Sequence, residues 1–179
     1  MYLMTTYFNE AINIVFQISL LSIPIIFILR IMGISILRQI SYLGLFCALY
    51  LILYATVLYS GLNFNTVIHN LNLQPFSWMN SSSGDHRLLG EVIPNIIMFI
   101  PLGFFLPQVF KSCRNPLISL FLILITTLSV ETIQYYTGRA ADIDDVILNV
   151  IGGLIGLIIY KIINILFSNI TWWKTLTSQ

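Results

Sequence analysis

The sequence predicts an all-α protein, a polytopic membrane bundle of about five transmembrane helices with its N-terminus outside and its C-terminus in the cytoplasm. Of its residues, 58% are hydrophobic and only 8% are charged, whereas a soluble domain carries about 25% charged residues. The apolar runs are long and lack the alternation of barrel strands, which indicates spanning helices of roughly 20 residues. The basic residues concentrate in alternate loops, and this pattern predicts the orientation.

Five apolar runs are long enough to cross a bilayer as helices. A polar stretch over residues 63–91 separates the second run from the third, and the other connections are short. The segment 71–76 within this stretch mixes leucine, phenylalanine and proline, so we expect it to lie on the membrane surface. The expected spans are about residues 11–29, 40–62, 92–110, 117–136 and 146–167.

Proline and glycine residues predict where the helices pack. Pro101 lies inside the third run with two further prolines, and neighbouring helices or water must then satisfy the carbonyls that lose an intrahelical donor. Gly103 follows on the face shared with Asn95, because residues at a spacing of four align along a helix. Gly152 and Gly156 form a small-residue surface in the fifth run that lets another helix approach closely.

The charges divide between the two sides of the predicted bundle. With the N-terminus outside, only Arg87 and Arg139 lie on the outer side, and every carboxylate lies there or at the outer membrane edge. The reverse orientation would place most basic residues outside, against the usual bias. The basic residues expected in the cytoplasm are Arg30, Arg38, Lys111, Arg114, Lys161 and Lys174.

A hairpin over residues 131–153 holds four of the seven acidic residues, Glu131, Asp142, Asp144 and Asp145. A carboxylate below the membrane edge costs at least about 2.5 kcal/mol unless it is paired or neutral. Glu131 therefore favours a functional site over a purely structural role. Asp144 and Asp145 have a simpler alternative, since either one could cap the fifth helix.

Three amides are expected at the same depth as these acids. Asn95, Gln134 and Asn149 all fall within about 10 Å of the outer edge at 1.5 Å rise per residue. Asn95 and Asn149 could equally serve only to form hydrogen bonds between helices. Arg139 lies in the turn above and is expected to pair with an acid of the hairpin, as a ligand contact or as a structural counter-ion. The pattern predicts an outward-facing polar site.

Several classes of function are disfavoured. No basic cluster exists to neutralise phosphates, so we expect no nucleic-acid partner. His69 and His86 lack a second ligand at metal spacing, and we expect neither a metal nor a cofactor. Cys47 and Cys113 do not form a disulfide framework and are expected to be free thiols.

An ordered set of motifs resembles the VanZ-like family of bacterial membrane proteins. The set comprises Asn95-x-x-x-Phe99-x-Pro101-x-Gly103, then Glu131-x-x-Gln134, Arg139, Asp142-x-Asp144-Asp145, and Asn149-x-x-Gly152-x-x-x-Gly156, preceded by Asn72-Leu73-Gln74-Pro75-Phe76. The resemblance covers about residues 43–166. It divides the chain into residues 1–38, an N-terminal helix with a basic loop outside the match, and residues 39–179, the VanZ-like bundle.

The resemblance implies a multi-pass protein of a bacterial plasma membrane. It also implies resistance to teicoplanin and related lipoglycopeptides, and it carries no catalytic mechanism with it. We therefore expect a site that engages a lipid-linked peptidoglycan precursor, a lipid headgroup or the lipoglycopeptide itself. The other expected partner is the lipid bilayer that surrounds the helices.

Two other functions stay open from the sequence. A membrane enzyme acting on a lipid-linked or phosphate-bearing substrate could use the clustered carboxylates as a base or for a divalent metal. No Ser-His or Cys-His arrangement supports catalysis, and this favours a non-enzymatic role. A transporter or flippase is the third candidate, and the lack of an inverted repeat disfavours it.

Overall fold

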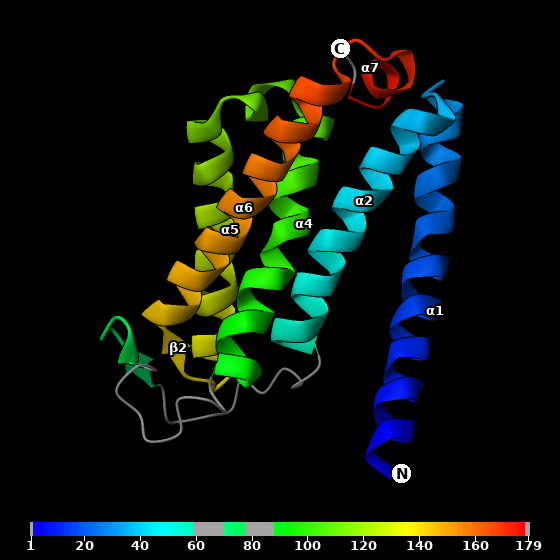
Figure 1. The fold of residues 1–179 in the computed structure, drawn as a ribbon. Helices are drawn as coiled ribbons and strands as arrows, with labels where there is room; N and C mark the ends of the chain where they lie inside the picture. Colours follow the sequence, from blue (N-terminus) through cyan, green and yellow to red (C-terminus); the bar gives the residue numbers. More distant parts are fainter. Residues whose placement is uncertain (1, 59–69, 78–87, 178–179) are drawn as a thin grey trace.

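The computed structural model describes residues 2–58, 70–77 and 88–177 (Figure 1). Helices account for most of this chain. The helices are α1 (Tyr2–Ile31), α2 (Ile36–Leu53), α4 (Ile93–Val109), α5 (Pro116–Tyr136), α6 (Ile143–Phe167) and α7 (Thr171–Thr177). The shorter elements are the π-helical turns η1 (Tyr54–Leu58) and η3 (Leu88–Val92), the 3-10 turn η4 (Lys111–Arg114), and the strands β1 (Leu71–Asn72) and β2 (Ala141–Asp142).

Five segments of the described chain are long and apolar enough to cross a membrane, which confirms the predicted class of all-α membrane bundle. The second begins earlier than the expected residue 40 because Ser35 caps α2 and accepts a hydrogen bond from the backbone N–H of Arg38. The segments are Ile12–Ile31, Ile36–Leu58, Gly90–Val109, Pro116–Tyr136 and Ile143–Phe167.

Helix α4 is the centre of the bundle and packs most closely against α6. A Cβ atom added at Gly103 would lie 2.0 Å from the carbonyl oxygen of Gly153 on α6. Conversely, a Cβ at Gly152 would lie 2.1 Å from the oxygen of Ile96, and one at Gly156 2.1 Å from that of Ile100. The two backbones are therefore in direct contact, and only glycine fits at these positions.

The buried core joins α2, α4, α5 and α6. Pro101 interrupts the hydrogen bonding of α4 without ending the helix, and it lies one residue before the fully buried Leu102. The buried apolar side chains of this core include Leu45, Ala48, Ile52, Phe99, Leu102, Leu106, Ile123 and Leu157.

Helix α1 lies at the edge of the bundle and packs chiefly against α2 (Figure 1). Of the residues described from Ile12 onward on α1, most are exposed, a few are half-buried, and Leu29 is the buried one. Such a helix contributes little to the core, and in a membrane its exposed apolar surface faces lipid.

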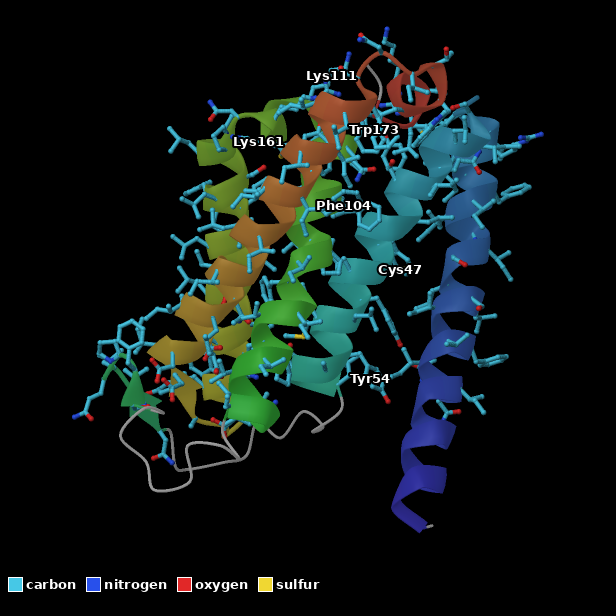
Figure 2. The ribbon with its side chains drawn as sticks, viewed as in Figure 1. Cys47, Tyr54, Phe104, Lys111, Lys161 and Trp173 are labelled. Atoms are coloured by element: carbon cyan, nitrogen blue, oxygen red, sulfur yellow. The ribbon has the colours of Figure 1, made fainter. Side chains whose placement is uncertain are left out.

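The two ends of the bundle differ in charge. We call the end that carries Glu91, Glu131, Asp142, Asp144 and Asp145 the acidic end, and the opposite end, with Arg30, Arg38, Lys111, Arg114 and Lys174, the basic end. The N-terminus lies toward the acidic end and the C-terminus at the basic end (Figure 1). Figure 2 places Lys111 and Trp173 together at the basic end, where the Trp173 indole is buried and donates a hydrogen bond to Asn164.

Candidate functional site

The turn between α5 and α6 folds back onto the end of α5. Gly138 has φ of +80°, a conformation that glycine adopts readily and that commonly ends helices. The next residue, Arg139, donates its backbone N–H to the carbonyl of Gln134 at 2.9 Å. This reversal brings the start of α6 beside the last turns of α5.

Glu131 and Asp142 are joined across this turn. The Glu131 carboxylate accepts the backbone N–H of Asp142 at 3.0 Å, and its side chain is only 7% exposed. Asp142 in turn caps α6, because its side chain accepts the backbone N–H of Asp144. We expected Asp144 or Asp145 to cap this helix. The structure corrects that expectation, because the capping residue is Asp142. The helix begins at Ile143, three residues earlier than the sequence suggested.

Asp144 fastens a distant segment onto the hairpin. Its carboxylate accepts the backbone N–H groups of Phe76 and Ser77, at 2.5 and 2.9 Å, and the hydroxyl of Ser77 at 2.9 Å. Asn72 donates a further bond to Asp142 at 2.9 Å. We call these contacts the acidic clamp. They occupy Asp142 and Asp144 with structural bonds.

Strands β1 and β2 extend the same attachment. They pair in parallel, with Leu71 opposite Ala141 and Asn72 opposite Asp142. We expected no strand from the sequence. The pairing is two residues long, and the backbone N–H of Ala141 donates to the carbonyl of Asn70 at 3.0 Å beside it.

Asp145 has a different environment from its neighbours. Its carboxylate accepts a hydrogen bond from the side-chain nitrogen of Asn95 at 2.6 Å. This bond joins the first turn of α4 to the first turn of α6, two elements distant in the sequence. It places an acid and an amide between helices, as the depth comparison suggested.

The carbonyl oxygen of Thr56 is a second meeting point. It accepts the side-chain nitrogen of Gln134 at 3.1 Å and the guanidinium of Arg139 at 2.7 Å. Thr56 lies in the π-helical turn η1 that extends α2, and such turns are frequent at functional sites. From the sequence we expected an acid of the hairpin as the partner of Arg139. The bond found here is to a backbone carbonyl, and the guanidinium charge also acts on Glu131 and Asp145.

These side chains line a cavity of about 220 Å³ at the acidic end, which we call the polar cavity. Its wall comes from η1, η3, α4, α5, α6 and the hairpin turn. The carboxamide oxygen of Gln134 is buried and has no hydrogen-bond partner among the described residues. The lining residues are Ala55, Thr56, Gly90, Glu91, Pro94, Asn95, Met98, Gln134, Arg139 and Asp145.

Glu131 lines a different hollow. It contributes to a largely apolar groove of about 370 Å³ on the flank of α5, which we call the α5 groove. Glu131 and Gln134 are three residues apart, so they are about 60° apart around the helix, and this separation directs them into different spaces. The groove is lined by Leu71, Leu73, Leu128, Glu131, Thr132, Tyr135, Tyr136, Ala141, Asp142, Ile143 and Val146.

Asn149 lies deeper than the polar cavity and does not line it. Its side chain is 1% exposed and donates a hydrogen bond to the Thr127 hydroxyl at 2.9 Å. The oxygen of its carboxamide has no partner within the described part of the chain. The structure therefore brings Asn95, Gln134, Arg139 and Asp145 together, and it separates Glu131, Asp142, Asp144 and Asn149 from them.

The segment that carries these residues matches a known sequence family. The VanZ/LLP1 family profile matches residues 39–164. The chain belongs to the VanZ/LLP1 family. The match begins within α2 and ends within α6, so it contains all eight candidate residues and leaves α1 outside.

A curated member of this family supports the assignment. The Protein VanZ of Enterococcus faecium is 38% identical to the chain over 102 residues, which are 56% of this chain and 58% of that protein. The chain thus matches little more than half of the relative's length. No solved structure matches the chain. The resemblance to the VanZ-like family is confirmed, and the chain is a multi-pass bacterial membrane protein.

Two polar residues that line the cavity of this VanZ-family chain were not expected from the sequence. Glu91 lies at the start of the third span, and the reasoning that singled out Glu131 applies to it equally. Thr56 acts through its backbone carbonyl, which no residue pattern reveals. His69 and His86 lie outside the described residues, and among the described ones no three His, Cys, Asp or Glu side chains are grouped to hold a metal ion.

Proposed function

We propose that the acidic end faces the outside of a bacterial plasma membrane. Support comes from the basic end, which gathers five of the chain's lysines and arginines, the residues that favour the cytoplasm. In this orientation the N-terminus is outside, the C-terminus is in the cytoplasm, and the polar cavity opens at the level of the outer leaflet.

We propose further that the protein lowers susceptibility to teicoplanin and related lipoglycopeptides without catalysing a reaction. The polar cavity would engage a lipid-linked cell-wall precursor, a lipid headgroup or the antibiotic. The observation that carries this proposal is the convergence of Asn95, Gln134, Arg139 and Asp145 on one cavity between helices. Polar groups at membrane depth are costly and are characteristic of binding sites.

The chemistry of the cavity suits a ligand that donates hydrogen bonds. The Gln134 oxygen and the carboxyl groups of Asp145 and Glu91 are acceptors, and Arg139 is a donor only. An ammonium, amide or hydroxyl group of a ligand would donate a hydrogen bond to the buried Gln134 oxygen. A buried acceptor without a donor lowers the stability of a fold by about 1–3 kcal/mol.

The test is drug susceptibility in a teicoplanin-sensitive bacterium that expresses the chain. We expect Gln134→Leu and Asn95→Leu to remove resistance, because each deletes a polar group of the cavity. Gln17→Leu is the matched control, since it removes an amide on α1, which contacts Tyr50 and lies outside the cavity. Membrane levels of each variant are measured by immunoblot. Unchanged susceptibility for both cavity variants at normal levels would refute the proposal.

A further inference from the structure

We infer that the α5 groove binds an acyl chain of a membrane lipid whose headgroup carries an amine. This inference deepens the proposed function and depends on its outward orientation. It concerns a space separate from the polar cavity, because the two hollows share no lining residue.

The groove is long in the direction of the helix. A second hollow of about 390 Å³, lined by Ile125, Leu128, Ser129, Thr132 and Ile133, shares Leu128 and Thr132 with it. From Ile125 to Tyr136 the continuous surface extends about 16 Å along α5, at 1.5 Å rise per residue. An elongated apolar channel of this kind matches an extended hydrocarbon chain in shape.

The groove opens on a surface that faces lipid. The side chains of Ile125 and Leu128 are 44% and 46% exposed, and both lie within the fourth membrane-spanning segment. At that depth the surroundings are hydrocarbon. The occupant therefore enters from the bilayer, and its chain already lies parallel to the helix there.

The headgroup class follows from the outer end of the groove. The Glu131 carboxyl group supplies its acidic lining, because both oxygens of Asp142 already accept hydrogen bonds, from Asn72 and from the backbone of Asp144. The Thr132 hydroxyl is bonded to the carbonyl of Leu128 at 2.7 Å, so its proton is already used. Carboxylates accept hydrogen bonds and attract positive charge. An ammonium headgroup complements this end, and a purely anionic headgroup does not.

The acidic clamp holds one wall of the groove in place. Leu71 and Leu73 flank Asn72, which donates to Asp142 and pairs with it across the strands. Phe76 and Ser77, at the end of the same segment, are held by Asp144. A wall held in advance reduces the ordering cost of binding. The clamp thus has a task beyond closing the hairpin, which is to place two leucines over the groove.

Photo-crosslinking of the full chain in lipid vesicles tests the inference. The probes are phosphatidylethanolamine and phosphatidylglycerol that carry the same diazirine in one acyl chain, and adducts are located by mass spectrometry. We expect the ethanolamine probe to label residues 125–136 in excess over Leu117 and Phe121, which are exposed on the same helix but outside the groove. Leu128→Trp should fill the groove and reduce labelling, whereas Phe121→Trp should not.

The headgroup preference is tested separately by Glu131→Gln. This variant should reduce the excess of ethanolamine over glycerol probe while labelling of the groove continues. Equal labelling around α5 would indicate ordinary lipid contact and overturn the inference, and adducts between two copies of the chain would identify the groove as a protein interface. Labelling requires no antibiotic. Groove adducts without resistance would therefore reject the proposed function alone, and resistance without groove adducts would reject this inference alone.

Discussion

Asn95 donates a hydrogen bond to Asp145 at 2.6 Å and so connects α4 to α6 within the polar cavity. The backbones of the same two helices are also in contact, where Gly103 faces Gly153 and where Gly152 faces Ile96. The cavity is thus built on the tightest helix pair of the bundle, which restricts how far its polar groups can move.

Two substitutions at Asp145 distinguish a binding site from a catalytic site. Asp145→Asn keeps an oxygen that accepts from Asn95 but removes any general base. If the site only binds, this variant should retain more teicoplanin resistance than Asp145→Leu, which removes the acceptor as well. The measurement is the minimum inhibitory concentration at matched membrane levels. Equal and complete loss in both variants would favour the enzymatic alternative, and mass spectrometry of the membrane lipids would then be used to look for a product.

The contact between α4 and α6 predicts a sharp glycine effect. Gly103→Ala places a methyl group 2.0 Å from the Gly153 oxygen, and the helices must separate. Overpacking of this kind costs about 1–3 kcal/mol, and occasionally more. Thermal unfolding of the detergent-solubilised protein should show a lower midpoint. Gly90→Ala is the control, because in the described part of the chain nothing beyond its own neighbours in sequence lies within 4 Å of the added Cβ. Similar midpoints for the two variants would mean that the helices are not in backbone contact.

The acidic clamp predicts local loosening when Asp144 is removed. Asp144→Ala deletes the acceptor of three hydrogen bonds to Phe76 and Ser77. Hydrogen exchange of the backbone amides of these two residues should accelerate strongly, because their protection comes from this carboxylate. Ser77→Ala removes only the hydroxyl bond and should have a smaller effect. Unchanged protection in Asp144→Ala would show that the segment 70–77 is held by something else.

The buried pair of Asn149 and Thr127 predicts a measurable coupling between α5 and α6. Their hydrogen bond is 2.9 Å long and fully enclosed. Hydrogen bonds between membrane helices contribute about 0.6 kcal/mol on average in double-mutant cycles. A cycle of Asn149→Leu and Thr127→Val, measured by reversible unfolding in detergent, should give a coupling of this size. Additive effects of the two substitutions would mean that the bond contributes nothing to stability.

The spans and the close approach of another helix to the glycines of the fifth span could be predicted from the sequence. Long apolar runs without the alternation of barrel strands span a bilayer as helices, because unpaired backbone groups are too costly there. Gly152 and Gly156 indicated close packing for a different reason, because a neighbouring helix approaches most closely where side chains are smallest. Gly138 could likewise be predicted at the end of α5, because few other residues adopt its backbone conformation.

The grouping of the site residues could not be predicted in this way. Spacing along a helix places two residues on nearby faces, but it does not say which neighbours fill the space between them. Glu131 and Gln134 are one turn apart, and yet the start of α6 separates the α5 groove from the polar cavity. The bond between Arg139 and Thr56 could not be predicted either, because the carbonyl that accepts it belongs to the backbone of another helix.

The sequence by itself determined that this chain is a five-span helical bundle with its acids at one end, because hydrophobicity and charge act on each segment independently of its neighbours. Only the tertiary structure decided which acids are available to a ligand. Asp142 and Asp144 hold the segment 70–77, whereas Asp145 lines the polar cavity and Glu131 the α5 groove. The physical reason is that a carboxylate takes the nearest donors, and the packing of distant segments sets which donors are near.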